Sequence, residues 1–303
     1  MAFDAFLLIA LMMAVGVLCR RLGALPDNAA EVLNRFALIV CLPAAILRHA
    51  PSLAFDAQLI GLIAVPWLLL AATVIAVRLF ERWRPLDASH RAVLLLCVPL
   101  GNTSFLGYPL VEAMLGKDAL RYAVAYDQFG SFIILSTWGL WVLARYGGDA
   151  RPTGAAILGR ILHFPPFVAL MVALLLMPAH PPTVVASVLE RLSDALLPIV
   201  TLAVGLQLRF RVPRDERLVL AFGLSAKLLL LPLLALLLTL LFGMPTTMRS
   251  ATVLESAMAP MITASALAIS HRLAPGLAAA LVGFGTPLSL LGVAAWHMLL
   301  AYL

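Results

Sequence analysis

Charged residues are scarce in this sequence. They make up 12% of the 303 residues, whereas 63% are apolar and the mean hydropathy is +1.04. A soluble domain of this length carries roughly a quarter of its residues as charged side chains. The shortage of charge excludes a water-soluble globule and predicts an integral membrane protein of the all-α class.

Cysteine is also scarce, and its placement excludes two further classes. Cys19, Cys41 and Cys97 lie far apart in or beside apolar runs, with no CxxC and no histidine at a metal-ligand spacing. This pattern excludes a disulfide framework and a structural zinc site. The net charge of +6 comes without a basic cluster interleaved with aromatic residues, so no nucleic-acid partner is expected.

Signatures of intramembrane enzymes are missing as well. The sequence contains no HExxH and no Gly-x-Ser paired with a membrane histidine. Tyr126-Asp127 is similar to the Tyr-Asp of intramembrane aspartyl proteases, but the Gly-x-Gly-Asp that those enzymes need is absent. The N-terminus lacks the positive region of a cleaved signal, so it is read as a retained span. We therefore expect no enzyme.

What the sequence has in abundance is long apolar runs. Crossing a membrane takes ~20 apolar residues, and the runs bounded by Arg, Pro and Gly predict ten spans, at about 3–19, 29–48, 57–80, 91–115, 120–145, 158–178, 188–209, 217–242, 248–271 and 275–302. Fifteen basic residues fall on the side reached after the odd-numbered spans, against five on the other side. The positive-inside rule then places both termini outside the plasma membrane.

The two halves of the chain are similar to each other. An odd number of spans per half inverts the second half, so residues 1–145 and 158–303 are predicted to form inverted repeats of five helices, joined by a cytoplasmic linker at 146–157. Leu42-Pro43 in span 2 matches Leu197-Pro198 in span 7, and spans 4 and 9 both break about eleven residues after a basic residue.

The breaks in spans 4 and 9 are the strongest functional signal. Span 4 contains GNTSFLGYP at 101–109, and span 9 contains ESAMAP at 255–260. Lipid does not tolerate backbone groups freed in this way, so both breaks must face protein or water. Interrupted helices at matching positions of inverted repeats indicate a midplane binding site, and half-helix N-termini there suit an anion. We expect Asn102, Thr103, Gln128, Pro260 and Met261 to bind substrate.

Several ionisable residues lie deep in the predicted spans, where each costs at least ~2.5 kcal/mol. Asp127 and Glu255 are expected to couple transport to a cation, with Ser131 supplying a further oxygen, and Lys227 is a potential charge partner of either acid. A static buried network that only specifies packing is the alternative interpretation of these residues. Asn34, close to a span end, is expected to be simply solvated.

The motifs at 101–109, YDQ at 126–128 and LPIVTLAVG at 197–205 resemble those of the auxin efflux carrier family, over essentially the whole chain. That family includes plant PIN-type carriers and bacterial malonate carriers. The resemblance implies an elevator carrier with a scaffold of spans 1, 2, 6 and 7, which often forms a homodimer. Spans 3–5 and 8–10 would form the transport domain, with substrate where spans 4 and 9 cross.

A more distant similarity to the bile acid sodium symporters bears on coupling. Those proteins carry Glu-x-Gly-x-Gln-Asn in span 9, and this chain keeps Glu255 but has Ala259 and Pro260 in place of the Gln and Asn. The similarity implies that one sodium site is lost. A second, formed by Asn102, Thr103, Glu255 and oxygens of Asp127 and Ser131, would remain.

These observations together predict a secondary transporter of a small organic anion, a mono- or dicarboxylate such as malonate, in the inner membrane of a bacterium. Its coupling ion would be sodium or a proton, and it would need no other cofactor. A ligand sensor that binds without flux, or an uncoupled uniporter or channel on the same fold, is the alternative.

Overall fold

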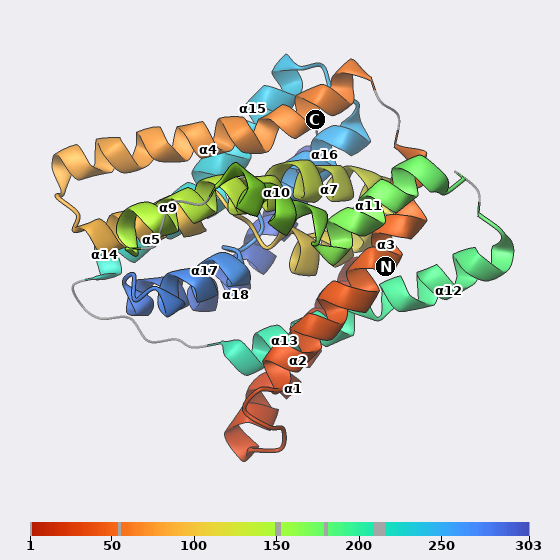
Figure 1. Cartoon of the computed structure of the whole chain (residues 1–303), viewed down its shortest axis with the longest axis horizontal. Helices are drawn as coiled ribbons and strands as arrows, with labels where there is room; N and C mark the ends of the chain where they lie inside the picture. The colour runs from red at the N-terminus through yellow and green to blue at the C-terminus, as the bar shows by residue number, and fades with distance from the viewer. Residues whose placement is uncertain (1, 54–55, 149–152, 179–180, 209–215, 303) are drawn as a thin grey trace.

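Helices account for most of the residues that the structure describes (Figure 1). The computed structural model describes residues 2–53, 56–148, 153–178, 181–208 and 216–302, and these ranges contain no regular β-strand. Part of the predicted linker, 149–152, lies outside the described residues. So do Arg151, Arg209, Arg211 and Arg214 of the basic residues that predict orientation.

The first half of the chain forms long helices interrupted by short π-helical turns. They are α1 (Ala2–Leu22), α2 (Ala29–Phe36), η1 (Ala37–Cys41), α3 (Leu42–His49), α4 (Ala57–Trp83), α5 (Ala88–Cys97), η3 (Thr103–Gly107), α6 (Tyr108–Leu115), α7 (Leu120–Tyr126), η5 (Asp127–Ser131), α8 (Phe132–Ile134), η6 (Leu135–Gly139) and α9 (Leu140–Tyr146).

The second half has the same character. Its elements are α10 (Gly154–Leu162), α11 (Pro165–Leu176), α12 (Thr183–Asp194), α13 (Leu196–Gln207), α14 (Arg217–Ser225), η8 (Ala226–Leu230), α15 (Leu231–Leu241), α16 (Thr246–Ser256), α17 (Ile262–Ser270) and α18 (Pro275–Leu300).

Length and composition allow several of these helical stretches to cross a membrane. Four qualify without interruption within the described residues, at 29–52, 57–83, 217–241 and 275–300. The pair α10 and α11, bent by 69°, makes a fifth. The chain is therefore a multi-pass membrane protein, while the count of ten spans stays a prediction.

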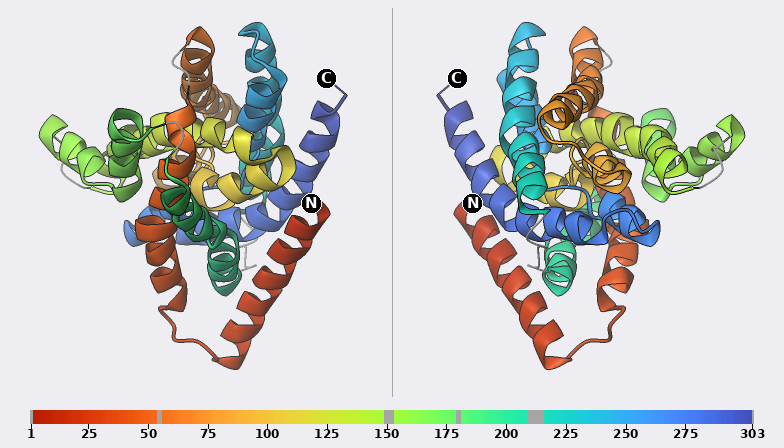
Figure 2. Two further views of the ribbon diagram at one scale, coloured as in Figure 1. Left: turned by 90° about the vertical axis from the view of Figure 1, so that its right-hand side faces the viewer. Right: turned by 90° about the vertical axis from the view of Figure 1, so that its left-hand side faces the viewer.

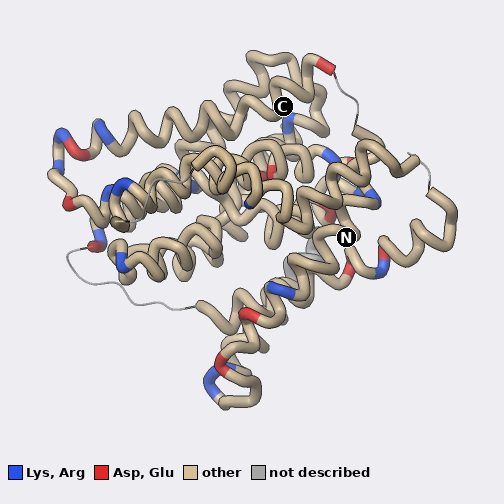
Figure 3. The backbone as a smooth tube through the Cα atoms, in the orientation of Figure 1, with Lys and Arg blue, Asp and Glu red and all other residues tan. Residues whose placement is uncertain are grey.

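The outer surface of the long helices suits lipid. Large apolar side chains are exposed along α4 and α15, among them Ile60, Ile75, Leu233 and Leu237. Figure 3 shows few charged residues along the middle of these helices, and more at the segment that joins α4 to α5. A water-facing surface would not leave such helix faces uncharged.

The helices pack in two groups. In one, α1 lies along α13, and α3 packs against α11 and α12. In the other, α15 packs against α4 and α16, and α17 packs against α5 and α18. Figure 1 shows the first group at the bottom and right and the second across the top and left, and Figure 2 shows α1 and α2 as a V that projects from the rest.

The contact between α1 and α13 depends on two glycines. A Cβ on Gly205 would collide with the backbone of Met13, and a Cβ on Gly16 would collide with the backbone of Leu202. Small residues of this kind let two membrane helices approach until their backbones touch.

We expect Gly205→Leu to separate α1 from α13 and to lower the free energy of unfolding by about 1–3 kcal/mol. Gly292→Leu on α18, where a Cβ meets nothing within 4 Å, is the matched control and should cost less. Thermal unfolding in detergent measures both, and equal losses would contradict the close-contact assignment.

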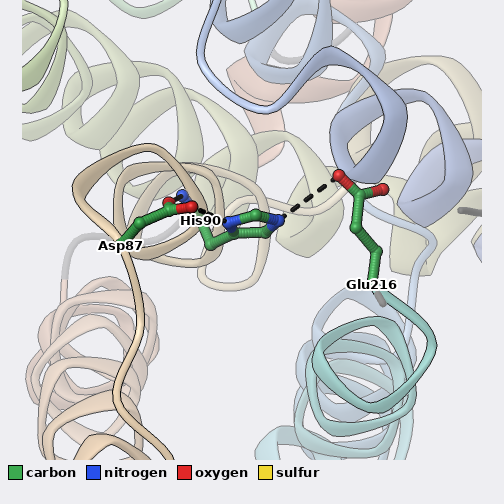
Figure 4. Close-up of polar contacts among 3 residues, drawn as sticks. All are labelled: Asp87, His90 and Glu216. Carbon is green, nitrogen blue, oxygen red and sulfur yellow. Dashed lines mark hydrogen bonds and ion pairs between the residues drawn. The ribbon is translucent and has the colours of Figure 1, made fainter. Parts of the chain in front are cut away.

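A polar cluster joins two loops at one end of the molecule (Figure 4). Asp87 caps α5 by accepting the backbone N–H of His90 at 2.8 Å. The His90 ring lies between two carboxylates, with Nδ1 2.7 Å from Asp87 and Nε2 3.3 Å from Glu216, the residue that precedes α14. Partial burial raises the pKa of Asp87, but the hydrogen bonds and charge of His90 outweigh it, so the pKa lies below its ordinary value.

Replacing Asp87 separates its capping role from its charge. Asp87→Ala should cost about 1 kcal/mol by removing the cap, whereas Asp87→Asn keeps a capping oxygen and should lose only the charge interaction. Because the pKa of Asp87 is lowered, the charge contribution is complete above the ordinary carboxyl pKa of about 4 and is lost as the pH falls below it. Thermal melts of both variants between neutral and acid pH test this, and a loss that grows on acidification would contradict it.

Candidate functional site

The two broken segments of the chain meet at the centre of the structure. α5 ends at Cys97, four residues before the predicted break at 101–109, and α16 ends at Ser256, within the predicted break at 255–260. The extended residues then pair with each other: the Asn102 N–H donates to the Ala259 carbonyl at 2.7 Å, and the Met261 N–H donates to the Leu100 carbonyl at 2.9 Å. This antiparallel bridge, centred on Gly101 and Pro260, satisfies backbone groups that lipid could not.

Five of the predicted site residues lie on π-helical turns. Thr103 begins η3, Lys227 lies in η8, and η5 contains Asp127, Gln128 and Ser131. A π-turn widens a helix by one residue and shifts the side chains that follow it, and such turns are frequent at functional sites. The sequence predicts the polar residues but gives no signal for these turns.

Asp127 is held by four donors. Its carboxylate accepts from Thr103 Oγ1 at 2.5 Å, Ser104 Oγ at 2.6 Å, Gln128 Nε2 at 2.8 Å and Tyr108 OH at 3.0 Å. A carboxylate has about four lone-pair sites, so the number of donors matches the acceptor capacity of this group without a cation, although three of the donors share Oδ2 and only Thr103 reaches Oδ1. The bonds tie η5 to the helix that restarts after the first break.

Glu255 has the opposite environment. It is fully buried, and neither carboxylate oxygen has a hydrogen-bond partner. The carboxylate rests against the backbone of Gly107, where any Cβ would collide with it. An acid in this setting needs a proton or a cation from elsewhere.

Lys227 is a buried basic residue in the same region as Glu255. It is 2% exposed, and its Nζ lies 3.1 Å from the position that a Cβ on Gly101 would occupy. Glu255 is close enough to interact with it electrostatically. Within the described residues, however, Lys227 forms no ion pair with Glu255 or with Asp127, so the direct pairing expected from the sequence is not made.

Other buried polar atoms near the bridge also lack partners. The Nδ2 of Asn102 and the Oε1 of Gln128 have none, and the two residues are 2% and 0% exposed. Ser131 is buried but, among the described residues, makes no bond to Asp127. No cluster of three His, Cys, Asp or Glu that could hold a metal ion occurs within the described ranges.

The predicted cation set is therefore assembled only in part. Glu255, with both oxygens unpartnered, fits a monovalent cation or a proton. Asp127 does not fit as well, since a cation would have to displace hydroxyl or amide donors from it. Thr103 is likewise committed, because its hydroxyl donates to Asp127.

A cavity of about 690 Å³ opens beside the bridge. Its inner wall consists of residues from the two breaks and η5, namely Asn102, Thr103, Ser104, Phe105, Asp127, Met261, Ile262 and Thr263. The opposite wall comes from α2, α3, α10 and α13, and includes Glu31, Asn34, Arg35, Leu38, Leu42, Arg160, Phe164 and Gln207.

Three of the five predicted substrate residues line this cavity, and two do not. Asn102, Thr103 and Met261 are on its wall, whereas Gln128 and Pro260 lie behind it. The sequence does not identify the residues of the opposite wall as part of a site. Asn34 was expected to be solvated at a span end, but its side chain lines the cavity and its buried Oδ1 has no partner.

A second cavity, of about 830 Å³, lies between α6 and the junction of α12 and α13. Tyr108, Glu112, Lys117 and Asp194 are among its lining residues. Tyr108 therefore lines one cavity while its hydroxyl bonds to Asp127, which lines the other. One hydrogen bond, from Tyr108 to Asp127, thus links the linings of the two cavities.

Broken helices that pair at the centre of a polytopic membrane protein, beside a cavity that their polar residues help to line, are the architecture of a membrane carrier. The family described as membrane transport protein matches the chain over residues 1–153 and 151–297. The chain belongs to this family, and the resemblance to the auxin efflux carriers is thereby confirmed.

Two curated relatives are similar along their whole length. An uncharacterized transporter of Methanothermobacter thermautotrophicus is 28% identical over 302 residues, which cover 98% of each chain. An uncharacterized transporter of Methanocaldococcus jannaschii is 24% identical over 309 residues, again with 98% of each chain covered. Family and relatives both favour a membrane transporter over an enzyme.

The hydrogen bonds to Asp127 predict a graded effect on stability. Asp127→Ala leaves four donors, three of them buried, without their acceptor and should lower the free energy of unfolding by about 3 kcal/mol or more. Tyr108→Phe removes one bond of the four and should cost roughly 1 kcal/mol. Thermal unfolding in detergent compares the two, and a loss for Asp127→Ala no larger than that for Tyr108→Phe would argue against the network.

Proposed function

We propose that this protein is a secondary transporter that moves a small organic anion, a mono- or dicarboxylate such as malonate, across the plasma membrane by alternating access. One observation carries the proposal: the paired breaks place the unpartnered amide of Asn102 and the N-terminus of α17 on the wall of a cavity that can hold a small solute. Static packing alone gives no reason for these groups to face a cavity.

Anion recognition at the inner end of the cavity follows from two features. Asn102 supplies a buried amide N–H group without a partner. α17 begins at Ile262 directly after the bridge, and its first residues line the cavity. The free N–H groups and positive dipole end of a helix N-terminus favour a carboxylate.

Coupling is assigned to Glu255, with sodium or a proton as the coupling ion. Its unpartnered oxygens and its contact with the helix that restarts after the first break support this role. Asp127 serves chiefly to fix the hydroxyls of η3 around the cavity. The sequence predicts both acids for coupling, and the different partners of the two carboxylates support Glu255 over Asp127 as the acid that titrates.

The proposed motion is of the elevator type, on ten spans arranged as two inverted repeats. α1, α2, α3 and α10–α13 would form the scaffold and the surface of a homodimer, while the remaining helices carry the cavity wall across the membrane. The packing of the helices in two groups supports this division. Both termini would lie outside the inner membrane of a bacterium, and the cavity, which Arg35 and Arg160 line, would open to the cytoplasm.

Uptake in proteoliposomes tests the coupling assignment. Glu255→Gln should abolish the dependence of carboxylate uptake on sodium or pH while exchange of labelled for unlabelled substrate continues, because the variant keeps the cavity and loses the titrating group. Asp127→Asn is the matched comparison. It should lower the amount of folded protein, and the folded fraction should largely keep the dependence of uptake on sodium or pH. If both variants leave uptake and its sodium and pH dependence unchanged, the assignment is wrong.

Counterflow separates the proposal from its alternatives. A carrier accumulates labelled substrate against unlabelled substrate trapped inside the liposomes. A ligand sensor on the same fold would bind carboxylate without flux, and a channel would give current that neither saturates nor shows counterflow.

A further inference from the structure

Two arginines on the wall opposite the bridge have no assigned role. Arg35 on α2 and Arg160 on α10 both line the 690 Å³ cavity, and both are exposed, which places them at its rim. From the sequence alone they count only as basic residues that set orientation. The cavity brings them together with the buried groups of the bridge, although they come from helices far apart in the chain.

Both guanidinium groups are available to a ligand. Within the described part of the chain, neither forms a hydrogen bond, an ion pair or a ring contact. Arg20 differs, because its guanidinium donates to the carbonyls of Leu206 and Leu208 at the end of α13. Arginine binds a carboxylate through two parallel N–H bonds, which gives it geometric selectivity as well as charge.

The other charges on the cavity wall do not neutralise the arginines. Asp127 is saturated by its four donors and is 1% exposed. Glu31, one turn before Arg35 on α2, also lines the cavity but makes no ion pair with it among the described residues. The rim thus carries two uncommitted cations and one exposed acid.

Apolar side chains complete the wall. Leu38, Leu42, Phe132 and Phe164 line the same cavity, and the rings of Phe132 and Phe164 stack with their centroids 4.0 Å apart. The cavity therefore combines a buried polar end at Asn102 and the N-terminus of α17, apolar surface, and a cationic rim.

We infer that the cavity binds a dianion, with one carboxylate at the bridge and the second on Arg35 and Arg160, and that these two arginines select dicarboxylates over monocarboxylates. This inference rests on the proposed function and sharpens its substrate class. A monocarboxylate can satisfy only one end of the cavity, and it leaves either Asn102 or the arginines without a charged partner.

Calorimetric binding to the full-length protein in nanodiscs of zwitterionic lipid tests the inference. Succinate and butyrate are the probes, since they share a carbon skeleton and differ by one carboxylate; glutarate and valerate form a second, longer pair. The wild type should prefer the dicarboxylate of each pair. Arg35→Gln and Arg160→Gln should each weaken succinate binding roughly tenfold and change butyrate binding little.

Matched variants separate direct binding of the second carboxylate by the two arginines from the effect of the protein's overall positive charge. Arg84→Gln removes an exposed arginine that does not line the cavity, and should leave both affinities unchanged. Arg35→Lys keeps the charge and loses the paired N–H bonds, so it should fall between wild type and Arg35→Gln. Glu31→Gln should strengthen succinate binding, because it removes the one acid at the rim.

The outcomes distinguish this inference from the proposed function. If the wild type binds succinate and butyrate equally, or if Arg35→Gln and Arg160→Gln weaken both to the same extent, dianion selection is overturned while an organic-anion carrier stands. Succinate binding that is unaffected by either variant would assign the arginines to lipid headgroups and would also overturn the inference. If no carboxylate of either pair binds, the proposed function itself fails.

Discussion

Two backbone hydrogen bonds between the broken segments are the constraint on which the rest of the structure depends. Asn102 bonds to Ala259 and Met261 bonds to Leu100. An interrupted helix inside a membrane leaves donors and acceptors that cost several kcal/mol each when unpaired. Because each break satisfies the other, neither segment can be non-helical alone. The pairing also fixes where the two helices restart, and so it sets the positions of η3 and the N-terminus of α17 beside the cavity.

The same constraint explains how two buried acids in one region come to differ. Asp127 faces the hydroxyls of the restarted helix, which saturate its oxygens. Glu255 is the last residue but one of α16, and its carboxylate lies against Gly107, where no donor is offered. One carboxylate is thereby a structural acceptor and the other an unsatisfied group. Burial is similar for both, so the difference comes from the partners and not from depth.

Prediction from the sequence succeeded where a single residue type is decisive. The membrane class follows from the shortage of charge, and the breaks follow from Gly101, Pro109 and Pro260. It failed for features that need two distant segments. The π-turns leave no compositional trace, and the cavity wall opposite the bridge comes from α2, α10 and α13. Gln128 and Pro260 were expected to bind substrate because they lie at or beside the predicted breaks, but neither lines the cavity, since Gln128 donates to Asp127 and Pro260 takes part in the bridge.

The sequence by itself therefore determined three things: that this protein is a membrane protein, at which residues its helices break, and which polar residues are buried at a cost that needs an explanation. These are local properties, set by the cost of moving charge and unpaired backbone from water into lipid. Only the tertiary structure decided that the breaks pair, that Asp127 is saturated while Glu255 is not, and that Arg35 and Arg160 share a cavity with Asn102. Each of these depends on which helices pack together, and helix packing in a membrane is governed by shape and by small residues such as Gly16 and Gly205.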